Sequence, residues 1–482
     1  MSADEVILIQ PPLPKSLRKE YISVQVPVNL GYIASSLVSQ GARVTIKDFV
    51  VEHYQRDSFL AEVRRRQPIF IGFTSMTSSL PFVHLISRHI KALNTGIITV
   101  LGGVHASALP LETLLELPHI DFIVVGEGEI TVRELYNEMR GTQDYRSVKG
   151  IVFRDKVTGE PCMTLRRSLI GNLDDVLFPA SGLFKTEQYR RAHVSRGFSR
   201  KQLAIMELLT SRGCPQNCIF CAGHINYENT VRFRSAENII REIETHIRIR
   251  RIEHISIEDD VFTLNKALVK ELGAYLRHKN ITWNCNARVD SVNQDIAFGM
   301  VQDNCRKVSF GIESGSDRIL RLSKKNTTVS QIKDAFRAFR KARIRHIEGN
   351  FMLGSHMDET IDDIKMTEEL IFYLQPDFIT LTVMCPFPGT EAYAIMEKEG
   401  LLPRQKNWFN FNLVTEKLPY KKLHHISSGE LLQWRNYLLK KYYTSSGYIL
   451  RQLFAIRNLR ELQYLLHLAM AVHRDSEKNT IR

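Results

Sequence analysis

Short apolar runs alternate with segments of helical spacing over about the first 145 residues. The segments Gly31–Ser39 and Pro81–Leu93 repeat apolar residues at three- and four-residue steps, which predicts amphipathic helices. Buried strands separated by helices favour a parallel α/β sheet with right-handed crossovers, of the flavodoxin-like or Rossmann-like kind. The expected strands are Val6–Gln10, Arg43–Asp48, Ile69–Ser75, Ile97–Gly102 and Phe122–Val125.

Small and polar residues follow the ends of these strands, as in Gly102-Gly103 and Gly126-Glu127-Gly128-Glu129. Sheets of this kind bind ligands at the carboxyl ends of their strands, and small residues there allow a bulky ligand to approach the backbone. The first strand is followed by Gln10-Pro11-Pro12 rather than by a Gly-x-Gly-x-x-Gly turn, so a dinucleotide site is only weakly indicated.

A second α/β series follows a poorly patterned stretch that holds one predicted hairpin around Thr158-Gly159. Six βα units favour a partial (β/α)6 barrel, more open than the eightfold form. The pattern divides the chain into a first domain at 1–145, a linker with the hairpin at 146–200, a barrel at 201–405 and a helical basic region at 406–482. The barrel strands are expected at Ala204–Thr210, His254–Ile257, Thr282–Asn286, Lys307–Gly311, His346–Leu353 and Phe378–Met384.

The net charge of +13 is concentrated near the end of the chain, where residues 405–482 hold 13 Lys or Arg against 5 Asp or Glu, a balance of +8. Helices are expected there at Glu430–Tyr443 and Gly447–Met470, and the basic residues are spaced along them without a nucleic-acid motif, so no nucleic-acid partner is expected. A solvated helical face, an acidic protein or a peripheral membrane contact fits the charge better. The chain shows no secretory signal and no membrane-length apolar run, so a cytoplasmic location is expected.

Three of the seven cysteines lie within eight residues, at Cys214, Cys218 and Cys221, directly after the first expected barrel strand. A Cys-x3-Cys-x2-Cys loop can place three thiolates on three irons of one [4Fe–4S] cluster and leaves the fourth iron open to a chelating ligand. A zinc site remains an alternative, because His224 completes a Cys3His set. The other four cysteines are expected to be ordinary buried thiols.

The loop resembles the cluster motif of the radical S-adenosylmethionine (SAM) superfamily, and later segments match that family in order over about residues 200–405. The resemblance implies SAM contacts at residues that follow successive strands, and it implies the turn Pro386-Phe387-Pro388-Gly389-Thr390. Without the resemblance, the acidic run at Glu258 would be a helix cap and Arg288 a structural ion pair. The implied SAM residues are Phe220, Glu258, Asp259, Arg288, Glu313, Ser314 and Gly349.

A Rossmann-like domain ahead of such a core is similar to the cobalamin (B12)-binding radical SAM enzymes. This resemblance implies cobalamin contacts at Ser75, Thr77, Gly102, Gly103 and Glu127. The family's Asp-x-His-x-x-Gly ligand loop is compared with Asp48–His53, where Val50 stands in place of the histidine. The resemblance therefore implies cobalamin without an imidazole below the cobalt, and a degenerate domain that binds no cobalamin is the alternative.

The resemblance implies an enzyme that reductively cleaves SAM, most simply a cobalamin-dependent methyltransferase acting on an unactivated carbon of a small molecule. A radical cyclase, dehydratase or hydroxylating enzyme without methyl transfer is the first alternative. A ligand-binding sensor with a structural cluster is the second. A flavodoxin or ferredoxin-type protein is the expected electron donor.

Overall fold

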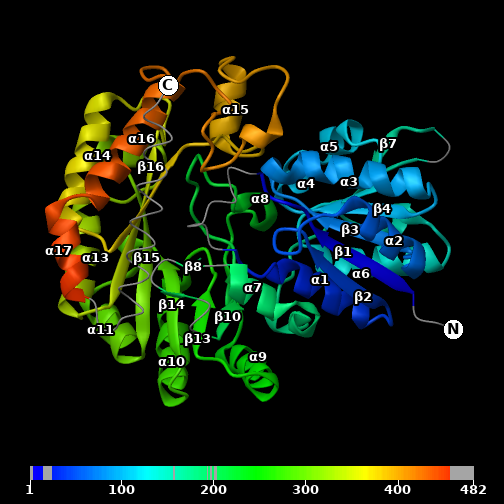
Figure 1. Ribbon diagram of the computed structural model, residues 1–482, viewed down its shortest axis with the longest axis horizontal. Helices are drawn as coiled ribbons and strands as arrows, with labels where there is room; N and C mark the ends of the chain where they lie inside the picture. Colours follow the sequence, from blue (N-terminus) through cyan, green and yellow to red (C-terminus); the bar gives the residue numbers. More distant parts are fainter. Residues whose placement is uncertain are drawn as a thin grey trace.

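The computed structural model describes residues 4–14, 24–155, 158–192, 194–195, 198–199 and 204–455, and all structural statements below concern these residues. Two sheets organise the chain, one of seven strands and one of six, each with helices packed beside it (Figure 1). The six-stranded unit lies on the left of the view and the seven-stranded unit on the right. Helix α8 (His224–Tyr227) lies between the two units and contacts α4 (Val104–Ala108) of the first.

The first sheet has the strand order β2-β1-β3-β4-β5-β6-β7. Its first five strands are parallel and follow the flavodoxin-like order, which confirms the predicted fold class. The predicted hairpin also forms, but it pairs antiparallel with β5 and so extends this sheet. The division of the chain at residue 145 stays a prediction. The strands are β1 (Glu5–Gln10), β2 (Arg43–Asp48), β3 (Phe70–Thr74), β4 (Ile98–Gly102), β5 (Phe122–Val124), β6 (Ile151–Arg154) and β7 (Pro161–Met163).

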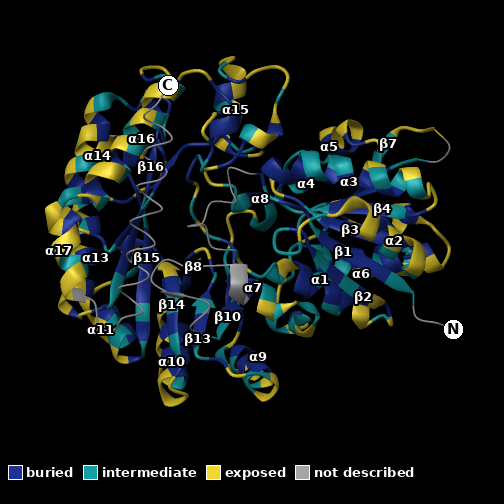
Figure 2. Cartoon of the chain, in the orientation of Figure 1, coloured by how far each residue is buried: buried dark blue, intermediate teal, exposed yellow. Residues whose placement is uncertain are grey.

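Alternation along β1 sends side chains into two apolar cores. Val6 and Leu8 pack on one face with α1 (Val28–Val38) and α6 (Gly128–Arg140). Ile7 and Ile9 belong to the other core, which includes buried residues of α2 (Arg56–Arg66) and α3 (Leu80–Leu93) and continues into the second unit. Figure 2 shows the strands buried and the outer faces of the helices exposed. The helices thus cover both faces of the sheet and leave its strand ends as the site for a ligand.

The second sheet has six parallel strands in the order β10-β13-β14-β15-β16-β17, as predicted for a partial barrel. Capping boxes start two of its outer helices. Thr328 precedes α13 (Val329–Lys341) and pairs with Gln331 in its first turn, and Thr360 precedes α14 (Ile361–Leu374) and pairs with Asp363 in its first turn. The other helices of this unit are α9 (Ala236–Ile249), α10 (Lys266–His278), α11 (Gln294–Gln302), α12 (Asp317–Leu322) and α15 (Glu391–Lys398). The strands are β10 (Ile205–Leu208), β13 (His254–Ile257), β14 (Thr282–Ala287), β15 (Cys305–Glu313), β16 (His346–Leu353) and β17 (Phe378–Val383).

The region after residue 405 makes two different contacts. A 3-10 turn, η8 (Trp408–Asn410), packs on the first unit, where the Trp408 indole donates to Glu116 at 2.7 Å. Helix α16 (Ser428–Tyr443) packs along β17, with Leu438 and Tyr442 buried and Tyr437 exposed. Helix α16 runs along β17, and the Tyr443 hydroxyl donates to the Ile379 carbonyl oxygen at 3.0 Å near the start of that strand.

Helix α17 (Ser446–Ala455) ends the described part, so Arg457 and Arg460 lie outside it. Within the described helices, none combines the length and the apolar character that a membrane crossing requires.

Candidate active site

The cysteine loop, residues 213–231, joins two short antiparallel strands, β11 (Ser211–Arg212) and β12 (Arg232–Phe233). Gly213 opens the loop at φ +89°, and a Cβ atom there would lie 2.1 Å from the Thr230 carbonyl oxygen, so only glycine fits. Cys214, Cys218 and Cys221 are all free thiols. One closed loop therefore presents three unpaired sulfur donors beyond the carboxyl end of β10, a donor set that fits three irons of one cluster.

Two cations act on this loop, Arg288 directly after β14 and Lys325 in the segment after α12. Burial raises the pKa of the Cys214 and Cys218 thiols, and the positive charges of Arg288 and Lys325 oppose that rise. Positive charge beside a group of thiolates favours their ionised, iron-binding form. The zinc alternative gains no support from His224, because its Nε2 atom lies 3.0 Å from the Gly389 carbonyl oxygen. In the part of the chain that the structure describes, no three His, Cys, Asp or Glu side chains converge on one metal-ion position.

Asp259 braces the start of the loop. Its buried carboxylate accepts hydrogen bonds from the Thr210 amide at 2.7 Å, the Thr210 hydroxyl at 2.5 Å and the Ser211 hydroxyl at 2.6 Å. Burial raises its pKa to about 6, against these bonds, which lower it. The resemblance implied a contact with SAM, but the protein itself occupies both carboxylate oxygens. Asp259 is therefore better described as a residue that positions the loop.

The other acidic residues after β13 face different partners. Glu258 accepts a hydrogen bond from the Gln25 amide at 2.6 Å, a contact with the first unit. Asp260 was not among the predicted site residues, yet its negative charge acts on Cys214 and Cys221. Burial raises the pKa of the Asp260 carboxyl. Its position directly after the predicted pair was the only sequence signal for it.

Arg288, Glu313 and Lys325 form one group beside the cysteines. Arg288 holds Asp290 through two nitrogens, at 2.9 and 2.8 Å, and also donates to the Lys325 carbonyl oxygen at 3.0 Å. Lys325 in turn donates to Glu313 at 2.9 Å. Glu313 adopts φ +70° at a register shift near the end of β15, a left-handed conformation that is uncommon for a non-glycine residue within a strand. The structure thus brings two predicted residues together and adds Lys325, which the sequence did not single out.

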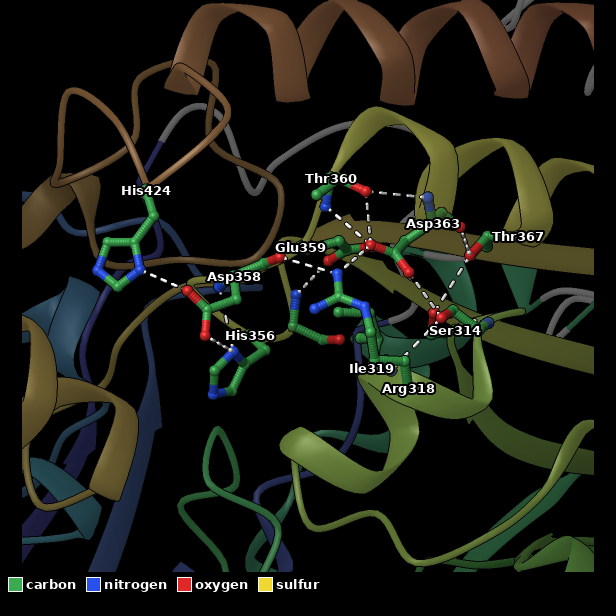
Figure 3. Close-up of polar contacts among 12 residues, drawn as sticks. Ser314, Arg318, Ile319, His356, Asp358, Glu359, Thr360, Asp363, Thr367 and His424 are labelled. Atoms are coloured by element: carbon green, nitrogen blue, oxygen red, sulfur yellow. Dashed lines mark hydrogen bonds and ion pairs between the residues drawn. The ribbon is translucent and has the colours of Figure 1, made fainter.

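Ser314, the residue after Glu313, faces Thr367 of α14 (Figure 3). Its hydroxyl is 3.3 Å from that of Thr367, and Arg318 pairs with Asp363 and reaches the Asp358 carbonyl oxygen at 2.9 Å. Asp358 lies 2.6 Å from His424, so the network continues into the region before α16. With its hydroxyl in this network, Ser314 supports the strand end from inside the protein.

Gly349 and Phe220 complete the predicted SAM set. Gly349 lies within β16, where a Cβ atom would come 2.9 Å from the Phe351 ring. Phe220 is half-buried and packs against the large core. Neither position contradicts a contact with SAM, and both roles stay predictions.

A cavity opens at the carboxyl ends of the first sheet, where β1, β3, β4 and β5 end. Its lining includes Gly102, Gly103 and Glu127, as predicted, together with Arg212 and Tyr227 of the second unit. A Cβ atom at Gly102 would meet nothing closer than 3.8 Å. The bare backbone on this side therefore fits the approach of a bulky cofactor.

Two other predicted cobalamin contacts are not in the lining. Ser75 is buried, and the Thr77 hydroxyl lies 3.2 Å from Nδ1 of His105. Both residues support the turn that follows β3.

The comparison of Asp48–His53 with a cobalt-ligand loop is also not supported by the geometry. Asp48 ends the edge strand β2 and accepts a hydrogen bond from the Tyr189 hydroxyl at 2.6 Å. Neither Val50 nor His53 lines the cavity. In this strand order the ligand crevice lies where β1 and β3 diverge, whereas β2, which Asp48 ends, is at the edge of the sheet.

Comparisons with known proteins agree with this geometry. The B12 binding domain family matches residues 17–136, and the radical SAM superfamily matches residues 208–371. An uncharacterised methyltransferase of Pyrococcus horikoshii is 29% identical over 465 residues, with 96% of each chain covered. An anaerobic magnesium-protoporphyrin IX monomethyl ester cyclase of Cereibacter sphaeroides is 25% identical, over 86% of this chain and 67% of its own.

The fold is also found in a solved structure, the radical SAM methyltransferase TsrM of Kitasatospora setae with a tryptophan substrate and a SAM analogue. The TM-score is 0.70 at 16% identity, over 92% of this chain and 89% of that one. With the three-cysteine loop and the strand-end cavity, these matches place the chain in the radical SAM superfamily, among the enzymes that carry a B12-binding domain.

Proposed function

We propose that the protein is a cobalamin-dependent radical SAM methyltransferase that acts on an unactivated carbon. The observation that carries this proposal is the shared wall between the two candidate sites. Arg212, two residues before Cys214, lines the cavity at the strand ends of the first unit. A cluster on the cysteine loop and a cobalamin in that cavity would thus be neighbours in one active site.

Cys214, Cys218 and Cys221 would hold the cluster, and the residues around them would orient SAM. Glu258 and Asp260 offer carboxylates to an ammonium group, and Glu313 offers one to ribose hydroxyls. Gly102 and Gly103 would let the cobalamin approach the backbone. When bound, these groups supply a radical that removes a hydrogen atom and a methyl group that replaces it.

Methylation of an unactivated carbon cannot proceed by polar displacement from SAM. A carbon without an acidic proton cannot attack SAM directly, so the difficult chemistry must come from cofactors. The protein must orient the reactants and exclude water. The buried contacts of Asp259 and Gly213 contribute to the orientation, because they fix the start of the cysteine loop. The relative named as a cyclase has a similar chain, so product analysis must decide between the reactions.

The test uses SAM with a deuterated methyl group and anaerobically reconstituted protein. A product that carries the labelled methyl group, with S-adenosylhomocysteine and 5′-deoxyadenosine as coproducts, is expected. Cys218→Ala should abolish product and 5′-deoxyadenosine together. Formation of 5′-deoxyadenosine with an unlabelled product and no S-adenosylhomocysteine would contradict the proposal and favour a reaction such as cyclisation.

An acidic flavodoxin or ferredoxin-type protein is the electron donor that best complements the basic C-terminal region. Lys440 and Lys441 are exposed on α16, although Lys441 already pairs with Glu368 at 2.6 Å. Attraction through solvent is screened over about 10 Å at 0.1 M salt. Flavodoxin-driven turnover should therefore fall steeply with added salt, and Arg457→Glu with Arg460→Glu should slow it while dithionite-driven turnover is spared. Equal losses with both reductants would reject donor docking.

A further inference from the structure

The two strands that close the cysteine loop carry two arginines side by side. Arg212 on β11 and Arg232 on β12 are direct cross-strand partners. Like charges at such positions repel each other, so the pair requires nearby negative charge. Both side chains are shielded from solvent, with 9% and 13% of the side-chain surface exposed, which increases that requirement.

The negative charge comes from the other unit, at the start of α6. Arg212 binds Glu127 at 2.8 Å and Glu129 at 2.5 Å, and Arg232 binds Glu127 at 2.8 Å. Two arginines and two glutamates balance in charge. Although burial opposes ionisation of both partners, these bonds lower the pKa of Glu127 and raise that of Arg212.

Further contacts fix the orientation of this cluster. The Arg212 guanidinium lies 5.1 Å from the ring centroid of Tyr32 on α1. The Ile170 amide donates to Glu127 at 2.8 Å, and Arg232 donates to the Ile170 carbonyl oxygen at 2.6 Å. The fork of Arg212 thus has a defined carboxylate on each arm and an aromatic ring on its face.

We propose that Arg212 is a positioning residue that docks the cysteine loop onto the Glu127–Glu129 turn and so fixes the distance between the two cofactors. The proposal rests on the proposed function, because it assumes a cluster on the loop and cobalamin in the cavity. Arg212 lies two residues before Cys214, and Glu127 and Glu129 line the cavity. A loosened pair would therefore shift one cofactor relative to the other without removing either.

A loosened contact would uncouple SAM cleavage from methyl transfer. A substrate radical formed beside the cluster must meet the methyl donor before it reacts otherwise, and a misplacement of about 1 Å can slow such a step roughly a hundredfold. Cleavage of SAM depends only on the cluster and the residues of the second unit around it. The number of methylated products per 5′-deoxyadenosine therefore reports on the docking.

The test measures that ratio in holoenzyme, with iron and cobalamin content determined in the same samples. Arg212→Met and Glu129→Gln should each lower the ratio about tenfold or more. Arg212→Lys should give a ratio between those of these two variants and that of the wild type, because the Lys ammonium cannot bind two carboxylates at once as the forked guanidinium does. The matched control is Lys307→Met, which breaks a similarly buried pair with Glu348, at 3.0 Å, between β15 and β16 of the second unit, and should keep the wild-type ratio.

An unchanged ratio in Glu129→Gln, or an equal fall in Lys307→Met, would overturn the proposal. If Arg212→Met fails to take up the cluster, Glu129→Gln decides, since it lies on the opposite unit. Hydrogen exchange of the cofactor-free protein separates the docking from the chemistry. Amides of residues 127–131 should exchange faster in Arg212→Met than in Lys307→Met, whether or not the wild type forms a methylated product, and equal exchange would also reject the docking.

Discussion

Gly103 lies at φ +104°, and a Cβ atom there would come within 2.5 Å of the Ser75 carbonyl oxygen. Gly102 beside it has open space at the same distance. The sequence predicted both glycines as contacts of one cofactor, but the structure separates their roles. Both glycines line the cavity, but only Gly103 is also required by the backbone of the strand end, whereas a side chain at Gly102 would have open space.

Substitutions at these two glycines should therefore fail differently. Gly103→Ala should lower the free energy of unfolding by more than about 1 kcal/mol, because the alanine clashes with backbone and φ is unfavourable. Gly102→Leu should keep its thermal melting temperature but fail to retain cobalamin, because its side chain enters the cavity. His53→Ala should still bind the cofactor. Retention of cobalamin by a folded Gly102→Leu protein would show that the cavity is not the binding site.

Glu359 is a second residue whose environment decides its chemistry (Figure 3). It is fully buried, and Oε2 accepts a hydrogen bond from the Ser355 amide at 2.8 Å. Among the described residues, Oε1 has no partner. Burial raises its pKa from 4.5 to about 8. The folded protein thus holds a proton that the unfolded chain releases at lower pH.

The contribution of Glu359 to the free energy of unfolding should therefore be largest below about pH 4.5 and decline as the pH rises to about 8. Glu359→Gln mimics the protonated form, so it should be more stable than wild type at about pH 8, by a few kcal/mol at most, and similar at about pH 4.5. Urea unfolding at several pH values measures this difference. Glu271→Gln, at an exposed position on α10, is the control. Identical pH dependence in wild type and Glu359→Gln would contradict the assignment.

At the scale of elements, hydrophobic periodicity predicted most of the fold. The predicted bounds of β2, β13 and β16 agree with the structure, because each is a clearly patterned run between turn signals. The partners of site residues were less predictable. Asp259 was expected to face SAM, but its carboxylate turns to Thr210 and Ser211, a choice that depends on how β10 and β13 align.

That contact makes the cysteine loop sensitive to Asp259. Asp259→Ala would leave the Thr210 amide and two hydroxyls without their acceptor, at a cost of about 1–3 kcal/mol for each buried group. Iron content after anaerobic reconstitution should fall, together with the melting temperature. Asp260, one residue further on, makes no hydrogen bond to β10 or β11 among those described. Asp260→Asn should therefore keep the wild-type iron content and melting temperature. A fully loaded, stable Asp259→Ala protein would disprove the bracing role.

At the scale of the whole molecule, the active site depends on how two separate sheets meet. The pairing of Arg212 with Glu127 and of Glu258 with Gln25 joins residues far apart in sequence, so no local pattern could predict it. The same is true of Lys325 beside Glu313. The sequence could predict the cluster motif and the two domain types because each is encoded within one continuous segment.

The measurement that tests the central claim most directly is metal analysis joined to SAM cleavage in anaerobically prepared protein. About four irons and four sulfides per chain are expected, and reduction should convert SAM to 5′-deoxyadenosine. Replacement of Cys214, Cys218 or Cys221 by alanine should abolish that conversion. Stoichiometric zinc without iron, or an iron cluster that leaves SAM intact under reduction, would contradict the account.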